Sequence, residues 1–402
     1  MKLNKKFPRD LTVLTHEYPP FPGGIATYCS EIVKALSNMG VRITVWAPTF
    51  GEEKAFNNGS SAKVVSFKGR VFKKSGFIKV LFLALKAIKA TPKGGGILAA
   101  DWPFVAACGL LRRFLPFSYS VMLHGSEILF FRRSKVVHLL LGGDPFFKAD
   151  KIFVNSAYTG SVLKANYPHI SDDRVVITHL GVNSFWLETS ENKISILDKL
   201  DIAKNKKIVL STGRIVPRKG QMRCINALQE LPKSLKKDIV YVIVGKTIDH
   251  AYDAEIRERA SQVDYPVIFA GTVTNEELRD LYRSSEVFCL PSQNNGTKIE
   301  GFGLVFLEAA GSALPSVAVA EAAVPEVVEN GESGILVGPD NQKALTEALK
   351  SVLENDTLSI KLGNAAQERA TTFTWDNCAL AMIKSFGDLE NKHTTWSPKK
   401  SA

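Results

Sequence analysis

Short apolar runs and helical patterns alternate along this chain in two successive series. In the first series, residues 11–15 read as a buried strand, 18–24 as a Gly/Pro loop, 25–39 as a helix and 41–47 as a second strand. A strand, loop, helix and strand in this order form the βαβ unit of a parallel sheet. Further strand-like runs follow at 120–123, 151–154 and 175–177. The first half is therefore expected to be a doubly wound α/β domain.

A second series follows a polar, poorly patterned linker at 187–204. Its strand-like runs lie at 208–210, 240–244, 267–270, 287–290 and 316–319, with helical patterns between them, as at 276–284 and 304–312. A chain of 402 residues suits two domains, here 1–190 and 200–372, with a last helix within 373–390. Two such series predict two doubly wound domains that face each other and bind ligands at the carboxyl ends of their strands.

The net charge of +11 is unevenly distributed. Residues 1–190 hold 25 Lys and Arg against 12 Asp and Glu, whereas the rest hold 26 against 28. A basic first half attracts a polyanion, which could be nucleic acid, an anionic membrane or a phosphorylated substrate, unless it is simply a solvated surface. Five scattered cysteines without a CxxC pair indicate reduced thiols and a cytosolic location. No apolar run is long enough for a transmembrane helix.

The stretch from Glu300 to Glu308 contains the richest set of candidate site residues. Gly301 and Gly303 let the backbone approach a ligand closely, and the helix that begins there directs free amides and its positive dipole end at the loop. This arrangement suits a diphosphate. A carboxylate nearby can accept the hydroxyl protons of a sugar or ribose. The alternative is that Glu300 merely compensates the helix dipole and that Glu308 is solvated.

Three cations lie together in the loop that follows the strand at 208–210. They are Arg214, Arg218 and Lys219. Arginine can bind phosphate oxygens in a bidentate fashion, and lysine adds a point charge. Such a group could stabilise a departing diphosphate without a metal ion, and the chain has no Asp-x-Asp motif. A solvated basic turn is the alternative.

Two further candidates lie in the first half. The loop at 19–24 ends in Gly23 and Gly24 between a strand and a helix, where amides could meet phosphate or sugar, although a plain tight turn is equally consistent. His124 follows the strand at 120–123, at the sheet edge where ligands bind in such folds. A structural histidine is the alternative there.

Taken together, these motifs make the chain similar to the GT4 family of retaining glycosyltransferases over essentially its full length. The resemblance rests on Glu300 and Glu308, and on further motifs in the same order: Gly23-Gly24, His124-Gly125, Gly213-Arg214, Lys219-Gly220, Val244-Gly245 and 269–271. It implies the GT-B fold, in which two Rossmann-like domains face each other across a cleft. It also implies that the acceptor binds the N-terminal domain, that the nucleotide-sugar binds the C-terminal domain, and that the last helix crosses back to the first domain.

The resemblance also implies roles for individual residues. Arg214 and Lys219 would bind the donor diphosphate, Glu308 the donor ribose, and Glu300 the transferred sugar. His124 would lie by the reacting sugar. The remaining donor contacts would come from Gly24 and from the backbone of Gly301, Phe302, Gly303 and Leu304. No metal or other cofactor is expected. The chain departs from the family pattern in two places. At 321–326 the Gly-Gly that the family often has before Pro-Glu is replaced, and the residues after Gly245 also differ. These departures leave the identity of the donor sugar and base open.

The expected function is retaining transfer of a sugar from a UDP- or GDP-sugar to a lipid-linked or envelope glycan acceptor, as in polysaccharide biosynthesis. A GT-B epimerase acting on a nucleotide-sugar is the enzymatic alternative. An inactive nucleotide-sugar-binding scaffold would not need the full set of site residues. A nucleic-acid-binding protein is a third class, but the chain lacks the interleaved aromatic and basic residues of such modules. We therefore expect no nucleic-acid partner.

Residues 54–100 carry ten Lys and Arg and no acidic residue. Within them, 73–89 read as a helix with Lys79, Lys86 and Lys89 on one stripe and a broad apolar surface elsewhere, and 130–135 form a second basic and apolar cluster. Such a helix can lie in an anionic interface. The expectation is peripheral attachment to the inner face of a membrane. The alternative is that the apolar face packs on the domain and the lysines are solvated.

Overall fold

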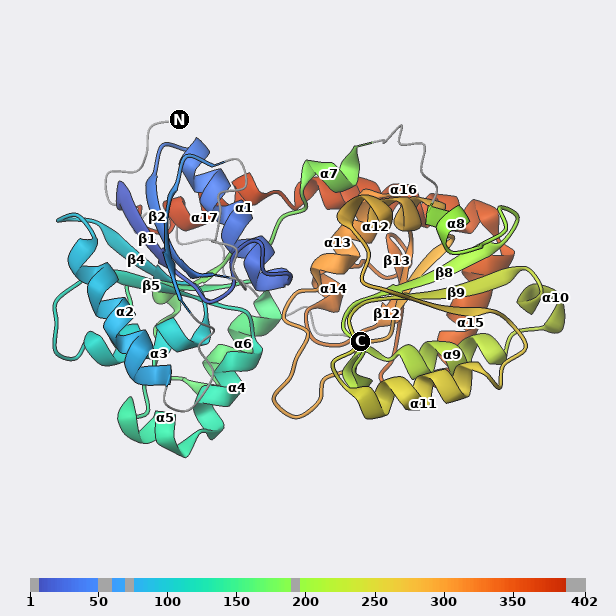
Figure 1. Cartoon of the computed structure of the whole chain (residues 1–402), viewed down its shortest axis with the longest axis horizontal. Helices are drawn as coiled ribbons and strands as arrows, with labels where there is room; N and C mark the ends of the chain where they lie inside the picture. The colour runs from blue at the N-terminus through green and yellow to red at the C-terminus, as the bar shows by residue number, and fades with distance from the viewer. Residues whose placement is uncertain (1–6, 50–59, 69–75, 189–195, 388–402) are drawn as a thin grey trace.

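The computed structural model describes residues 7–49, 60–68, 76–188 and 196–387, and it consists of two halves that each contain a fully parallel sheet (Figure 1). The sheet of the first half has the strand order β3-β2-β1-β4-β5-β6-β7. Its strands are β1 (Asp10–Leu14), β2 (Arg42–Pro48), β3 (Lys63–Phe67), β4 (Gly96–Ala99), β5 (Tyr119–Leu123), β6 (Ile152–Val154) and β7 (Val175–Ile177). The chain order reverses direction at β1, so β1 and β4 lie side by side. This is the switch point at which doubly wound sheets bind ligands.

Helices cover both faces of this sheet because its strands are apolar on both sides. One face packs against α1 and α17, and the other packs against α2, α3, α4 and α6. The helices are α1 (Gly24–Asn38), α2 (Gly76–Ala90), α3 (Trp102–Leu111), α4 (Ser126–Arg133), α5 (Lys135–Leu140), α6 (Ala157–Asn166) and α17 (Trp375–Lys384). The last of these comes from the end of the chain and packs on α1.

The second half repeats the plan with the strand order β10-β9-β8-β11-β12-β13. Its strands are β8 (Lys207–Thr212), β9 (Ile239–Val244), β10 (Val267–Gly271), β11 (Val287–Leu290), β12 (Ser316–Val319) and β13 (Gly334–Val337). The helices α9 (Gln221–Gln229), α11 (His250–Ala260) and α15 (Gln342–Glu354) cover one face. The other face is covered by α12 (Asn275–Ser284), α13 (Leu304–Gly311) and α16 (Asp356–Thr372). Shorter helices are α7 (Ser184–Leu187), α8 (Ile196–Lys199), α10 (Lys233–Lys236) and α14 (Val324–Val327).

The predicted fold class is confirmed, with local differences. The strands β3, β4 and β13 were not among the predicted runs. The segment predicted as a linker contains α8, whose Ile196 is buried in the core. Within the described parts of the chain, no helix is long and apolar enough to cross a membrane.

One carboxylate joins the two halves directly. Glu326, on α14 of the second half, accepts hydrogen bonds from the amides of Ala157 (2.7 Å) and Tyr158 (2.8 Å) at the start of α6 in the first half. Its Oε2 also lies 3.0 Å from Nε2 of His179. Burial would raise the pKa of Glu326, but the hydrogen bonds from His179 and the two amides outweigh it and lower the pKa below its usual value. A negative charge at the amino end of a helix is stabilising, so Glu326 couples the halves.

We predict that Glu326→Ala lowers the free energy of unfolding by roughly 1–2 kcal/mol at pH 7, because two helix amides and His179 lose their acceptor. Since the folded-state pKa is depressed, this contribution is present above the ordinary glutamate pKa and is lost as the pH falls through the folded-state value. Urea unfolding at pH 7 and pH 4 measures both effects. The control is Glu329→Ala, an exposed residue paired with Arg369. Equal losses in the two variants would contradict the assignment.

Candidate functional site

A buried charge cluster lies where the loops after β8 and β11 meet. Oε2 of Glu300 lies 2.8 Å from Nη1 of Arg218 and 2.7 Å from Nζ of Lys219, and all three side chains are at most 14% exposed. Burial alone would raise the pKa of Glu300, but the two cations lower it to about 2. Burial lowers the pKa of Lys219, and the charge of Glu300 opposes that effect. Glu300 is therefore ionised at neutral pH and bound by two cations.

Close backbone packing positions this cluster. Arg218 and Lys219 lie in a single 3-10 turn that ends at Gly220, which has a positive φ of 76°. A Cβ on Gly220 would lie 2.4 Å from the carbonyl oxygen of Pro291, in the loop after β11. The amide of Gln293, in the same loop, donates to the carbonyl of Arg218 at 2.9 Å. The two loops are thus held against each other, and Glu300 meets its cations as a consequence.

Arg214 lies in the same loop but is exposed and has no ion-pair partner within the described residues. Its carbonyl accepts a hydrogen bond from Nε2 of Gln221 at 3.2 Å, which fixes the backbone there. The sequence assigned Arg214 and Lys219 the same role. Among the described residues, Lys219 is paired with Glu300, whereas Arg214 forms no ion pair. Arg218 was recognised as one of three cations, but its pairing with Glu300 was missed. The only sign of this pairing in the sequence is the position of Arg218 beside Lys219.

The loop residues after Glu300 approach the first half closely. A Cβ on Gly301 would lie 1.8 Å from the carbonyl oxygen of His124, and the carbonyl of Gly301 accepts a hydrogen bond from Oγ of Ser156 at 2.8 Å. Gly301 is therefore required by packing between the halves. This packing is enough to explain why residue 301 is a glycine, so the predicted close approach of a ligand is not needed to explain it. The side chain of Phe302 is buried with its ring 6.0 Å from that of Phe373, so only the Phe302 backbone is left for a ligand.

Two helices begin at this boundary. Gly303 precedes α13 with a φ of 89°, and a Cβ there would lie 2.7 Å from the ring of Phe306, so both conformation and space favour glycine. Gly24 is the first residue of α1, and a Cβ on it would lie 3.7 Å from Cδ1 of Leu304, the first residue of α13. The amino ends of α1 and α13 are thus neighbours across the boundary. Both provide free amides and a positive dipole end for an anion.

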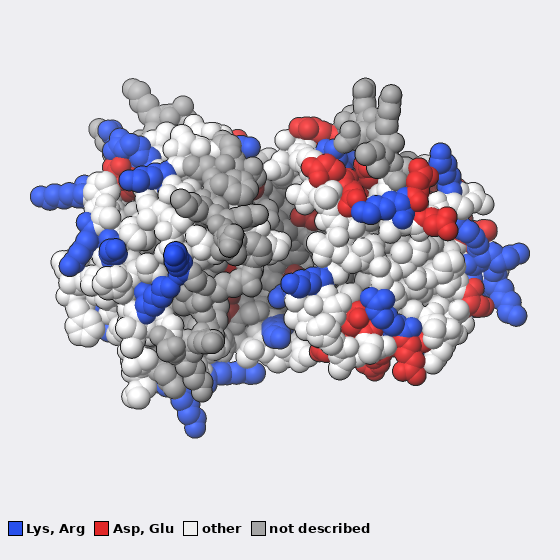
Figure 2. Space-filling view, viewed as in Figure 1, with Lys and Arg blue, Asp and Glu red and all other residues white. Residues whose placement is uncertain are grey.

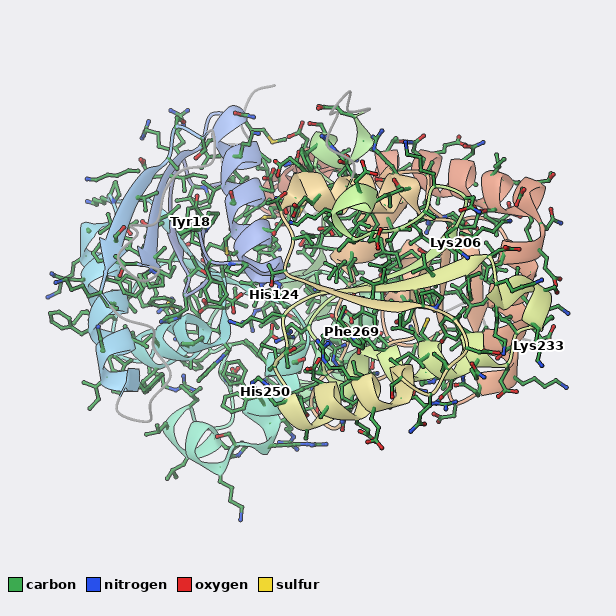
Figure 3. The ribbon with its side chains drawn as sticks, turned by 45° about the vertical axis from the view of Figure 1, so that its right-hand side comes forward. Tyr18, His124, Lys206, Lys233, His250 and Phe269 are labelled. Carbon is green, nitrogen blue, oxygen red and sulfur yellow. The ribbon has the colours of Figure 1, made fainter. Side chains whose placement is uncertain are left out.

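His124 lies at the junction of the two halves (Figure 3). Its Nε2 is 3.0 Å from the carbonyl oxygen of Ala100. Because a carbonyl only accepts hydrogen bonds, this contact places a proton on Nε2. The ring forms a T-shaped contact with Tyr28, with centroids 5.2 Å apart, and the backbone amide of His124 donates to the carboxylate of Glu127. Nδ1 is consequently the ring nitrogen that remains for a ligand.

Glu308 is separate from the charge cluster. The hydroxyl of Tyr282 donates to its Oε2 at 3.3 Å and lies 3.0 Å from Oγ1 of Thr212 at the end of β8. Burial raises the pKa of Glu308 to about 7, and the hydrogen bond from Tyr282 offsets this only in part. The two glutamates of the motif therefore differ in charge state. Glu300 is fully ionised near neutral pH, whereas Glu308 titrates there.

A buried histidine–carboxylate pair at the ends of β1 and β4 was missed by the sequence analysis. Nδ1 of His16 lies 3.2 Å from Oδ1 of Asp101, and Oγ1 of Thr15 donates to Oδ2 of Asp101 at 3.2 Å. The His16 ring stacks on Phe104 with centroids 4.5 Å apart. A histidine directly after a strand was the available signal. Across the described residues, no group of three His, Cys, Asp or Glu side chains is arranged to hold a metal ion.

Comparison with known families covers both halves of the chain. The model described as "Glycosyl transferases group 1" matches residues 192–369, and that described as "Glycosyltransferase Family 4" matches residues 22–184. The chain belongs to the GT4-type glycosyltransferases. Its two parallel sheets with helices on both faces are the GT-B fold that the resemblance implied.

Individual relatives of this glycosyltransferase are distant. A D-inositol 3-phosphate glycosyltransferase of Streptomyces avermitilis is 27% identical over 240 residues, which cover 58% of this chain and 50% of the relative. An uncharacterized glycosyltransferase of Methanocaldococcus jannaschii is 24% identical and covers 93% of this chain and 97% of its own length. Among solved structures, the HepE protein of Anabaena in complex with UDP and glucose has a TM-score of 0.74 and 20% identity, covering 94% of this chain and 98% of its own.

The raised pKa of Glu308 predicts that this residue destabilises the free protein. Its folded-state pKa of about 7 lies above the unfolded value of 4.5, so ionising it costs stability as the pH rises from 4.5 to 7, and the full cost remains above pH 7. We expect Glu308→Gln to raise the free energy of unfolding at pH 8 by roughly 1–3 kcal/mol, since one pKa unit is about 1.4 kcal/mol and partial exposure reduces the effect. Denaturant unfolding at pH 5 and pH 8 is the measurement.

The matched control is Glu347→Gln, an exposed glutamate on α15. It should leave the stability unchanged at both pH values. A Glu308→Gln variant that is equally stable at pH 8, or less stable there than the wild type, would show that Glu308 is not held in a desolvated position.

Proposed function

We propose that this glycosyltransferase transfers a sugar, with retention of anomeric configuration, from a UDP- or GDP-sugar to a lipid-linked or envelope glycan acceptor. The observation that carries the proposal is the position of ionised Glu300. It lies beside the amino end of α13 and the cationic loop after β8, and its neighbour Gly301 contacts His124 of the other half. A nucleotide-sugar in this place would present its diphosphate to the cations and its sugar to Glu300 and His124.

The groups around the diphosphate have complementary charge. The exposed guanidinium of Arg214 forms no ion pair with any described residue, and the amides at Gly303 and Leu304 open α13. A diphosphate bound there would be stabilised by charge-assisted hydrogen bonds and by the helix dipole. HepE of Anabaena, which shares the fold, has been solved with UDP and glucose. Glu308 lies deeper along α13, where its carboxylate could accept the ribose hydroxyls of the nucleotide.

We propose front-face attack for the chemical step. The bond between the anomeric carbon and the diphosphate oxygen breaks, and the acceptor oxygen bonds to the same face of that carbon. The acceptor proton moves to the leaving phosphate oxygen. Arg214, Lys219 and the amino end of α13 stabilise the charge that develops on the diphosphate. Glu300 and His124 orient the transferred sugar, and no covalent sugar–enzyme intermediate is required.

Arg214→Ala should weaken the binding of UDP or GDP by roughly 1.5–3 kcal/mol, because one charge-assisted contact to the diphosphate is lost. Arg214 is a cleaner test than Lys219, whose removal would also leave Glu300 with one cation fewer. Calorimetry with each nucleoside diphosphate is the measurement. Lys233→Ala, which removes an exposed lysine on α10, is the control and should bind like the wild type. An unchanged affinity in Arg214→Ala would remove Arg214 from the phosphate site.

The reaction itself is tested with a panel of UDP- and GDP-sugars and glycolipid acceptors. Nuclear magnetic resonance of the purified product should show the same anomeric configuration as the donor, and turnover should persist in excess EDTA. An inverted product would contradict the front-face step. A donor converted to its epimer without any acceptor would identify an epimerase instead. Loss of turnover on chelation, restored by magnesium or manganese, would contradict the role given to the cations.

We also propose that the protein attaches to an anionic membrane through α2. The helix buries Val80, Leu83, Ala84 and Ala87 against the domain, so the packing alternative accounts for that face. Its outer face remains amphipathic, because Ile78 is 76% and Phe82 59% exposed beside the exposed Lys79, Lys86 and Lys89. Lys73 and Lys74 of the predicted helix lie outside the described residues. In the view of Figure 2, the first half shows mostly Lys and Arg among its charged side chains, while the second half shows both signs.

Changing Lys79, Lys86 and Lys89 together to Glu should weaken attachment to anionic vesicles by about two orders of magnitude, since each lysine near such a surface contributes about 1 kcal/mol. Co-sedimentation with phosphatidylglycerol-containing and phosphatidylcholine vesicles, at low and high salt, measures it. The same reversal at the exposed Lys237, Lys343 and Lys361 of the second half is the control. Equal partitioning to both vesicle types would show that the outer face of α2 is a solvated surface and does not attach the protein to anionic membranes.

A further inference from the structure

An open basic groove lies between α4 and α5 and shares no lining residue with the charge cluster at Glu300. It has a volume of about 510 Å³ and is lined by Arg132, Arg133, Lys135, His138 and Leu139. All five side chains are exposed. Within the described part of the chain, no carboxylate pairs with either arginine or with Lys135. The groove is therefore a concentrated, uncompensated positive site.

The groove adjoins the donor site. Helix α4 begins at Ser126, directly after His124 and Gly125, and runs for eight residues to Arg133. At 1.5 Å per residue it is about 12 Å long. A Cβ on Gly296 would lie 4.0 Å from Nη1 of Arg133, so the end of α4 also borders the loop that leads to Glu300. In Figure 2, several Lys and Arg side chains border the hollow between the halves. A molecule in the groove could thus reach His124 along α4.

The helix dipole accounts for only two of these three cations. Arg132 and Arg133 lie in the last turn of α4, where a positive charge is favoured by the helix dipole. Lys135 begins α5, where the same effect disfavours a cation. Its charge therefore adds to the two arginines at a local cost, which points to a shared anionic ligand. A phosphate or diphosphate matches a groove lined by three cations and a histidine.

Exposed apolar side chains lie beside the same cations. Leu139 is 83%, Leu140 48% and Phe130 39% exposed. Large apolar side chains that border a charged site suit an amphiphile rather than a simple anion. A free phosphate would leave these side chains in water. A phosphate attached to a hydrocarbon chain would use both parts of the surface.

We propose that the α4–α5 groove binds the phosphate or diphosphate that links the acceptor glycan to its lipid. The hydrocarbon chain contacts Leu139, Leu140 and Phe130, and the glycan lies along α4 with its reacting hydroxyl at His124. The length of α4 then limits the acceptor to a short glycan between phosphate and hydroxyl. This inference rests on the proposed transfer to a lipid-linked acceptor and names the chemistry by which that acceptor is recognised.

The test uses decyl diphosphate as the probe, with inorganic diphosphate and decyl maltoside for comparison. Calorimetry is done on the full chain, below the critical micelle concentration, with the donor site first saturated by UDP and then without UDP. We expect decyl diphosphate to bind at least tenfold more tightly than either comparison compound when UDP is present. Arg133→Gln combined with Lys135→Gln should weaken that binding at least tenfold, and Leu139→Ser should weaken it severalfold. The same glutamine changes at Lys237 and Lys343 are the control and should have no effect.

Each outcome decides the matter. Unchanged affinity in the Arg133 and Lys135 variant would overturn the groove as the phosphate site. Equal affinity for inorganic and decyl diphosphate would overturn the lipid assignment and leave a site for a free anion. The titration without UDP keeps the two proposals separate. If the wild type binds neither UDP nor GDP but the groove variants still lose decyl diphosphate, the donor assignment fails and the groove assignment stands.

Discussion

The ion cluster of Glu300 with Lys219 and Arg218 is the interaction on which the rest of this structure depends. Removing one cation from a buried carboxylate strongly destabilises the folded protein, so the two loops that supply these residues must stay together. Gly220 permits their close approach, because any Cβ there would meet Pro291. The cluster therefore holds the loop after β8 against the loop after β11. It also fixes a negative charge next to the amino end of α13 and the cations of the loop after β8, where we propose that the diphosphate-linked sugar binds.

A second set of contacts holds the two halves together at the candidate site. The backbone of Gly301 packs on His124, and Glu326 accepts hydrogen bonds from the first turn of α6. These contacts bring a loop of the second half onto the carboxyl edge of the first sheet. Residues that would touch the donor and residues that would touch the acceptor are consequently neighbours. The same contacts place the amino end of α1, at Gly24, opposite that of α13.

Much of this arrangement could be predicted from the order of motifs. Strands that run into Gly-rich loops and then helices specify the carboxyl edge of a parallel sheet, so His124, Arg214 and Glu300 were expected there, and they lie there. Pairing between distant loops could not be predicted. Nothing in a single sequence shows that Arg218 meets Glu300, or that Gly301 is needed for contact with a backbone carbonyl. The charge states also depend on burial, which is why the difference between Glu300 and Glu308 appears only in three dimensions.

The most direct test of the site is a comparison of Glu300→Gln with the wild type, measuring the affinity for UDP or GDP and the turnover of the corresponding nucleotide-sugar. The substitution keeps the shape but removes the charge that Lys219 and Arg218 bind, so its unfolding must be checked to ensure that assays run on folded protein. If Glu300 contacts the transferred sugar, turnover should fall at least a hundredfold, while the nucleotide affinity changes less than about threefold. Turnover close to that of the wild type, or a nucleotide affinity that falls as much as turnover does, would contradict this position for the sugar.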